Sequence, residues 1–413
     1  MALAVACGLG TAWSLYPRGG VTLGDAILLA VAPVVLSAAW RWKHARTWLW
    51  FLALWWLATA FTELVTHDTV RHAVYALCRP LTVALSFCGA LWALQHRTAV
   101  ARAYIVTLVA GSMVAASLYP SANMRVDPWK YGYGPVVSLG VILLSAVLLS
   151  RGRRLAATLL LAAVALVSLV LGFRSEFIIT ALAASVGLLT AGRGPGRAWR
   201  RYLLTGGALC ALTAVVYIGY GHLASDGELG PQQQMRWERQ SRVEGGLLIG
   251  ARPEIIASAT VIAGWSPVGR GVSPRVDMET RTAFLQHLHG LGIKLHEGFD
   301  YYYFNRGLYL HSVLFQLWAE AGILVLPGLL FPMLVVLWAL LAAIRAGSGP
   351  GTLAFCFLFS HLAWDTLFSP WPRLHAVYLG TAAAAAVLYL ARQRGSVPVP
   401  TPLVSTPGKK ELS

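Results

Sequence analysis

Charged residues are scarce in this sequence. Of its 413 residues, 12% are charged and 57% are hydrophobic, and the mean hydropathy is +0.62. A water-soluble protein of this length carries more charge on its surface, so the composition excludes the soluble globular class. Apolar runs of about twenty residues recur along the chain, which is the length that crosses a hydrocarbon core. We therefore predict an all-α, polytopic membrane protein.

Motifs of nucleotide and metal chemistry are also lacking. The chain has no G-x-x-x-x-G-K-[ST] phosphate loop, which argues against a nucleotide-driven pump. It has no D-x-D pair and no H-E-x-x-H motif, and His287, His289 and His296 have no acidic or Cys partners at ligand spacing. None of the five cysteines lies in the longest hydrophilic segment. We expect no metal, no cofactor and no disulfide framework in that segment.

The hydropathy pattern predicts about twelve transmembrane helices. They cover residues 2–16, 25–40, 47–66, 75–94, 103–119, 133–150, 155–172, 177–191, 202–221, 323–344, 351–368 and 374–391. This division gives nine helices over 1–221, a loop or cap over 222–308, and a half-helix followed by three helices over 309–394. The tail over 395–413 is rich in Pro, Ser, Thr and Val and is predicted to be disordered.

Basic residues predict the orientation of these helices. The loops after the even-numbered spans, together with the tail, hold 17 of the 33 basic residues and one acidic residue. The other 16 basic residues are balanced by 16 acidic ones, so the formal charge of +16 belongs to one face. The positive-inside rule makes that face cytoplasmic, with both termini there and the large loop on the opposite side. The charge indicates contact with anionic membrane lipids and not with nucleic acid.

The large loop, from His222 to Leu308, has the composition of a folded cap. Its nine basic and nine acidic residues are mixed with Trp237, Trp265 and the aromatic run 301–304. Trp and Tyr rings favour the membrane interface, so the loop is expected to rest there. Arg252-Pro253-Glu254 predicts the start of a helix that ends near Gly264.

A polar residue set follows the loop, at the start of a predicted helix. Ser312, Gln316 and Glu320 recur at four-residue spacing and form one stripe, and His311 stands just before them. A helix N-terminus disfavours an imidazolium, so His311 is a candidate general base. The simpler interpretation is an interfacial histidine that hydrogen-bonds the helix end.

Two further charged residues are predicted near the same face. Arg174 lies in the tight hairpin between the spans 155–172 and 177–191, where a charge is costly unless it is paired or functional. A salt bridge to Glu176 is the simpler explanation. Asp365 follows His361 by four residues, which predicts a helical i, i+4 pair. A histidine with several arginines at an outer interface suits an anionic lipid-linked substrate, because arginine binds pyrophosphate bidentately.

Three segments resemble the O-antigen ligase and polymerase superfamily. HSVLFQLWAEAGI (311–323) resembles its H-[NS]-x₇-E-x-G signature, GARPEIIASATVIAGWSPVGRG (250–271) resembles its G-R…P-x-x-G-x-G stretch, and FRSEFIITA (173–181) resembles its S-R hairpin. The likeness spans about residues 130–390. Ser312 stands where Asn is common, and Phe173 stands where Ser is usual. The chain length and the single large loop resemble the ligase branch more than the polymerase branch.

The resemblance implies a metal-independent, inverting glycosyl transfer on the periplasmic face of the bacterial inner membrane. The donor would be an undecaprenyl-pyrophosphate-linked polysaccharide, and the acceptor a sugar hydroxyl of lipid A–core. His311 would deprotonate or orient that hydroxyl, while Arg174 and Arg252 would hold the pyrophosphate. Asp365 matches a late acidic residue of the family. Arg242 and Arg270 are secondary candidates.

Two other functions stay open from the sequence. An O-antigen polymerase would use the same donor with a second lipid-linked chain as acceptor. A secondary transporter or flippase would carry no chemistry, and it should show inverted repeats and ionisable residues near the bilayer midplane.

Overall fold

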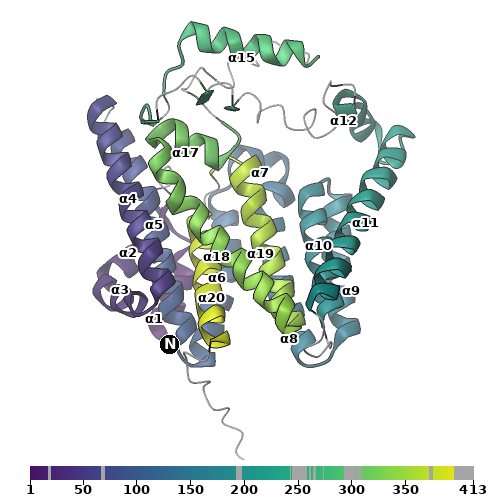
Figure 1. Ribbon diagram of the computed structural model, residues 1–413, viewed down its shortest axis with the longest axis horizontal. Coiled ribbons are helices and arrows are strands. Elements are labelled where there is room, and N and C mark those ends of the chain that lie inside the picture. The colour runs from purple at the N-terminus through teal and green to yellow at the C-terminus, as the bar shows by residue number, and fades with distance from the viewer. Residues whose placement is uncertain are drawn as a thin grey trace, which may run out of the picture.

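Helices make up most of the chain in the computed structural model, which describes residues 1–16, 20–66, 70–191, 198–241, 243, 258–259, 262–263, 267–272, 274–292, 304, 308, 310–371 and 375–394. Ten long helices form a bundle (Figure 1). They are α4 (Lys43–Thr66), α5 (Val70–Gln95), α6 (Thr98–Leu118), α8 (Gly134–Ser150), α9 (Arg154–Val170), α10 (Arg174–Thr190), α11 (Ala198–Ser225), α18 (Leu326–Ala346), α19 (Gly349–Phe368) and α20 (His375–Gln393).

The protein is a multi-pass helical membrane protein. Within the described ranges, six segments are long and apolar enough to cross a bilayer, or seven if a bent pair counts as one span. The six are Lys43–Thr66, Val70–Gln95, Thr98–Leu118, Trp129–Ser150, Ile323–Ala346 and Gly349–Phe368. The predicted class is therefore confirmed, whereas the predicted number of about twelve spans stays a prediction.

The first predicted span, 2–16, is wrong. Helix α1 (Ala2–Gly10) has nine residues, and at 1.5 Å per residue it is only about 14 Å long. The chain then forms strand β1 (Ser14–Tyr16), which pairs antiparallel with β2 (Val21–Thr22). Ala4 and Cys7 are buried against the protein. The apolar run therefore forms a short, partly buried helix followed by a strand, and not one continuous span.

The second predicted span, 25–40, is broken. Helices α2 (Leu23–Ala30) and α3 (Ala32–Trp40) meet at an angle of 77°. Pro33 lies in the first turn of α3 and cannot donate a backbone hydrogen bond to the preceding turn. The proline therefore accounts for the break.

Glycines let α10 and α19 approach closely. A Cβ added at Gly187 would lie 2.7 Å from the Leu353 Cβ, and one added at Gly349 would lie 2.5 Å from the Ala191 Cβ. Real Cβ atoms do not come this close, so only glycine permits the contact at both places. The backbones of α10 and α19 are consequently packed closely together at the end that is farther from Arg174.

The cap end of the bundle, defined by α12 (Pro231–Ser241) and α15 (Met278–Gly290), lies opposite Met1 and the C-terminal end of α20 (Figure 1). The cap has its own small core, built around Phe284, Leu288, Leu308 and Leu310. Asp277 caps α15, and the hydrogen bond from the Thr280 backbone N–H holds the pKa of Asp277 below its ordinary value. Most of the helix predicted from Arg252 to Gly264 lies outside the described residues.

At the opposite end, basic residues from distant parts of the chain gather. The Arg394 guanidinium lies 5.2 Å from the centre of the Trp338 ring, and His44 packs edge-on against the same ring. His44 belongs to the segment that contributes Arg41, Lys43 and Arg46 to the predicted cytoplasmic face. Two of the predicted basic segments, 41–46 and the start of the tail, therefore lie at the same end of the bundle, whereas the placement of all basic loops on one face stays a prediction.

Residues 267–272, which we call the strap, tie the cap to the bundle. Helix α17 (Val313–Ala321) ends at Gly322 and is followed by η2 (Ile323–Val325) and α18. Within the strap, the Arg270 and Gly271 N–H groups donate to the α17 carbonyls of Ala319 and Glu320, each at 2.9 Å. The Ile323 N–H donates to the Pro267 carbonyl at 2.8 Å. The two longest motifs of the superfamily resemblance therefore contact each other through their backbones.

Gly322 is the position where this junction depends most on glycine. Its φ of 85° and ψ of −179° belong to a region that side chains avoid, and an added Cβ would lie 2.3 Å from the Pro267 carbonyl oxygen. We expect Gly322→Ala to cost about 1–3 kcal/mol of stability from the backbone conformation alone. Thermal unfolding in detergent measures this. Gly290→Ala is the control, because no atom lies within 4 Å of its added Cβ. Equal unfolding temperatures for the two variants would contradict the prediction.

Candidate active site

A deeply buried ion pair at the cap end joins Arg79 of α5 to Glu320 of α17. Their side chains are 6% and 5% exposed, and the guanidinium donates directly to the carboxylate. The Arg79 guanidinium also lies 4.4 Å from the centre of the Tyr75 ring and 5.8 Å from that of Trp371. Cation–π contacts of this kind stabilise a desolvated guanidinium. Arg79 is thus fixed by one charge and two aromatic rings.

The predicted polar stripe of α17 is buried and hydrogen-bonded. The Gln316 side-chain amide donates to Glu320 Oε1 at 2.7 Å and to the Leu308 carbonyl at 3.2 Å, while its oxygen accepts from the Leu310 N–H. Ser312 Oγ accepts from the Phe315 N–H and donates to the Thr366 carbonyl at 3.0 Å. The stripe therefore connects α17 to the cap, to α5 and to α19, which explains why a buried face carries polar residues.

His311 lies one residue before the Ser312 cap of α17, half-buried at the cap end. The sequence placed it at the start of a helix, and the structure confirms that position. Because Ser312 bonds to Thr366, the neighbouring residues His311 and Asp365 belong to adjoining segments. The structure thus brings two of the predicted site residues into one region.

Asp365 belongs to a cluster of ionisable side chains between α10, α19 and α20. The predicted i, i+4 pair is confirmed, with His361 Nδ1 3.2 Å from Asp365 Oδ2. The other ring nitrogen, Nε2, lies 3.6 Å from Glu176 Oε2. His375 Nδ1 lies 3.9 Å from Asp365 Oδ2. Carboxylates and imidazoles therefore alternate in the order Glu176, His361, Asp365, His375.

Arg174 begins α10, at the cap end. Its guanidinium donates to the Gln233 side-chain oxygen of α12 and lies 4.3 Å from the centre of the Tyr220 ring of α11. The salt bridge to Glu176 suggested by the sequence is wrong, because the buried Glu176 carboxylate faces His361 instead. Arg174 is therefore at the contact between the bundle and the cap.

Of the other three predicted arginines, the structure describes only Arg270. Arg252 and Arg242 lie outside the described residues, so their predicted roles stay predictions. Arg270 belongs to the strap, and its guanidinium lies 3.7 Å from Asp277 in a half-exposed pair. A pair this exposed contributes little to stability.

Sequence reasoning missed Arg79, Glu176 and His375 as members of the site. Arg79 carried the clearest signal, because it is an isolated charge within the predicted span 75–94, and such residues are paired or functional. Its partner Glu320 was predicted as part of the polar stripe and as the acid of the signature over 311–323. Trp371 connects the two buried groups, since its ring lies near Arg79 and packs edge-on against His375 at 4.8 Å. We call the resulting series of side chains from Glu320 to Glu176 the polar belt.

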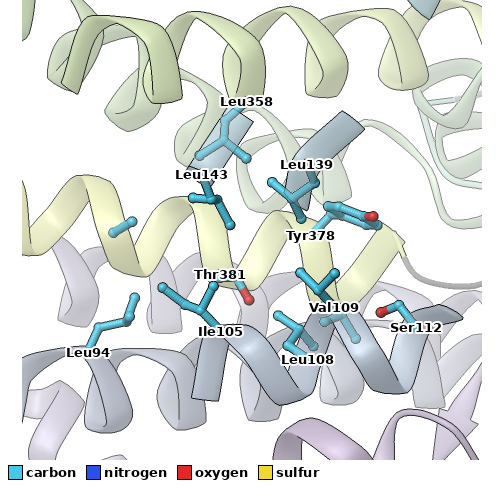
Figure 2. A pocket seen from close by; sticks show the side chains of 12 residues that line it. Leu94, Ile105, Leu108, Val109, Ser112, Leu139, Leu143, Leu358, Tyr378 and Thr381 are labelled. Carbon is cyan, nitrogen blue, oxygen red and sulfur yellow. The ribbon is translucent and has the colours of Figure 1, made fainter. Parts of the chain in front are cut away.

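An apolar cavity adjoins the polar belt. Tyr378 and Thr381 of α20 line it together with leucines of α6, α8 and α19 (Figure 2). The Tyr378 ring stacks on the His361 ring at 5.9 Å, so one wall of the cavity is shared with the belt. Its volume of about 100 Å³ has room for a few methylene groups only. The cavity therefore does not by itself define a substrate site.

Neither a metal-ligand cluster nor a matching protein family assigns a role to this region. In the described ranges, no three His, Cys, Asp or Glu side chains are arranged to hold a metal ion. No protein-family model matches the chain, and no curated protein sequence matches it. The assignment of function consequently depends on the residues and their geometry.

The Arg79–Glu320 pair yields a stability prediction. Glu320→Gln removes the carboxylate and leaves a buried guanidinium without its counter-charge, which costs about 3–5 kcal/mol. We expect a large fall in the unfolding temperature in detergent. Adding Arg79→Met to Glu320→Gln should recover most of the loss, because the stranded charge is removed. If the double variant were as unstable as the sum of the two single variants, the pair would not be coupled.

Proposed function

We propose that the protein is an O-antigen ligase that transfers a polysaccharide from undecaprenyl pyrophosphate to a sugar hydroxyl of lipid A–core. The observation that carries the proposal is the convergence of the resembling segments. The strap bonds to the end of α17, Ser312 of α17 bonds to α19, and the α10 hairpin faces α19 through Glu176. Segments that are about 140 residues apart in the sequence thus meet at one end of the bundle, where a lipid-linked pyrophosphate would lie.

In the proposed reaction, His311 accepts the proton of the acceptor hydroxyl. The hydroxyl oxygen attacks the anomeric carbon of the donor sugar as the bond from that carbon to the pyrophosphate oxygen breaks. A single displacement inverts the configuration of the carbon. Arg174 and Arg252 stabilise the negative charge that builds on the departing pyrophosphate. Asp365 orients the acceptor or one of the arginines.

A polymerase of the same superfamily would carry out similar chemistry. The products that accumulate in cells after loss of the gene differ between the two enzymes. Loss of a ligase leaves long chains on the undecaprenyl carrier. Loss of a polymerase instead leaves lipid A–core that bears a single repeat unit. A gene deletion followed by analysis of the lipid-linked and core-linked chains separates these outcomes.

A transporter is favoured by one observation, the burial of ionisable residues in the bundle. Arg79, Glu320, Glu176 and His375 are all at most 6% exposed, and buried charges of this kind also occur in transport pathways. Transfer from purified donor to purified acceptor, without ATP or added metal, decides between the two classes.

His311→Ala is the central test of the proposed base. We expect it to abolish transfer in the purified system while insertion and the unfolding temperature stay near those of the wild type, since His311 is only half-buried. His289→Ala, on the exposed face of α15, is the matched control and should keep full activity. Full activity in His311→Ala would remove His311 from the mechanism.

Arg174 provides a test of donor binding. Arg174→Ala should raise the KM for the lipid-linked donor and lower kcat, since the pyrophosphate loses a bidentate partner. Arg174→Lys should recover only part of the loss, because an ammonium keeps the charge but lacks the planar fork. Steady-state kinetics with varied donor measure both effects. Complete rescue by lysine would show that only the charge matters.

A further inference from the structure

The position of His361 between two carboxylates has a consequence that the proposed mechanism does not use. Its Nδ1 lies 3.2 Å from Asp365, and its Nε2 lies 3.6 Å from Glu176. A neutral imidazole carries a proton on one nitrogen only, whereas an imidazolium carries protons on both. Two carboxylates on opposite sides of the ring therefore match the doubly protonated form.

Two further contacts favour a positive charge on this ring. His361 stacks on Tyr378 with an interplanar angle of 14°, and an aromatic face attracts a cation. Glu176 is 1% exposed, and among the described residues His361 is the basic side chain within 4 Å of its carboxylate. The nearest positive charge that can balance an ionised Glu176 is therefore His361.

The surroundings of His361 contain few other charges. Glu176 faces it from α10, Asp365 from its own helix α19, and His375 and Tyr378 from α20. On the remaining helices that pack against α19, the described charged residues are Glu320, which binds Arg79, and Arg345, in the last turn of α18 at the end farther from the cap. The two carboxylates consequently dominate the field at the ring.

We propose that Glu176, His361 and Asp365 form a charged clasp, in which an imidazolium joins α10 to α19 and so fixes Arg174 relative to Asp365. Arg174 is two residues before Glu176 on the same helical turn, and Asp365 is one turn after His361. Glu176 and His361 are positioning residues that do not touch substrate. This role depends on the proposed function, whereas the charge of the clasp does not.

The charge is tested without any assay of activity. Nitrogen NMR of the purified full chain, labelled with ¹⁵N-histidine, reports the protons on each ring at pH 7.5, where an ordinary histidine is mostly neutral. We expect one histidine to carry both protons at this pH and to disappear from the spectrum of His361→Gln. A singly protonated His361 at pH 7.5 would overturn the clasp.

The coupling is tested by a double-mutant cycle. His361→Gln leaves two carboxylates near each other without a cation, so it should lower the unfolding temperature sharply. Adding Glu176→Gln removes one of these stranded charges and should raise the temperature again. Additive losses in the double variant would overturn the clasp, because coupled residues give a non-additive result.

The positioning role is tested by kinetics. A misplaced reacting group costs about 100-fold in rate, and we expect His361→Gln to lower kcat for transfer by about this factor. The double variant His361→Gln/Glu176→Gln should regain stability but keep the low kcat, which separates misplacement from unfolding. His289→Gln, which removes an exposed histidine, should keep the wild-type kcat. Wild-type kcat in His361→Gln would overturn the positioning role. An inactive wild-type protein would instead overturn the proposed function, and the NMR and unfolding results would still decide on the clasp.

Discussion

The cap end of this protein depends on the ion pair between Arg79 and Glu320. Each side chain alone would be a buried charge inside an apolar bundle, and each is stable there because the other is present. The pair joins residues that are 241 positions apart in the sequence. It fixes α17 against α5, and the backbone of the same Glu320 then accepts the hydrogen bond from Gly271 of the strap. The position of His311, at the start of α17, follows from these two attachments.

Local patterns in the sequence predicted the features that depend on neighbouring residues only. His311 stands at the start of a helix, His361 and Asp365 are one turn apart, and within the described residues the apolar runs of α4, α5, α6, α8, α18 and α19 belong to segments long enough to cross a bilayer. The partners of Arg79 and Glu176 could not be predicted, because a side chain's spacing along a helix does not reveal which distant helix it faces. The first predicted span failed because α1 ends at Gly10 and the chain then forms a strand, and this pairing with β2 is not visible in the apolar pattern.

Two departures from the superfamily pattern have different structural consequences. Ser312 replaces a common Asn, yet serine and asparagine are both favoured caps, and Ser312 does cap α17. Serine at this position therefore caps the helix as asparagine would. Phe173 replaces a usual Ser at the cap of α10, and it makes no side-chain cap hydrogen bond. The start of α10 is therefore held by other contacts, among them those of Arg174 and Glu176.

The location of the polar belt bears on the choice between an enzyme and a transporter. Asp365 and Glu176 lie within the last or first turn of their helices at the cap end, and His375 is the first residue of α20. Arg79 is nine residues from the start of α5, which corresponds to about 14 Å of a helix almost 40 Å long. The belt thus crosses the bundle within the half that is nearer the cap. A transport pathway needs polar groups from one face to the other, whereas a site for chemistry on a lipid headgroup needs them at one face. The ionisable groups of the belt lie at the face where the proposed chemistry would take place, whereas buried hydroxyl groups such as those of Ser145 and Thr352 lie in the other half of the bundle.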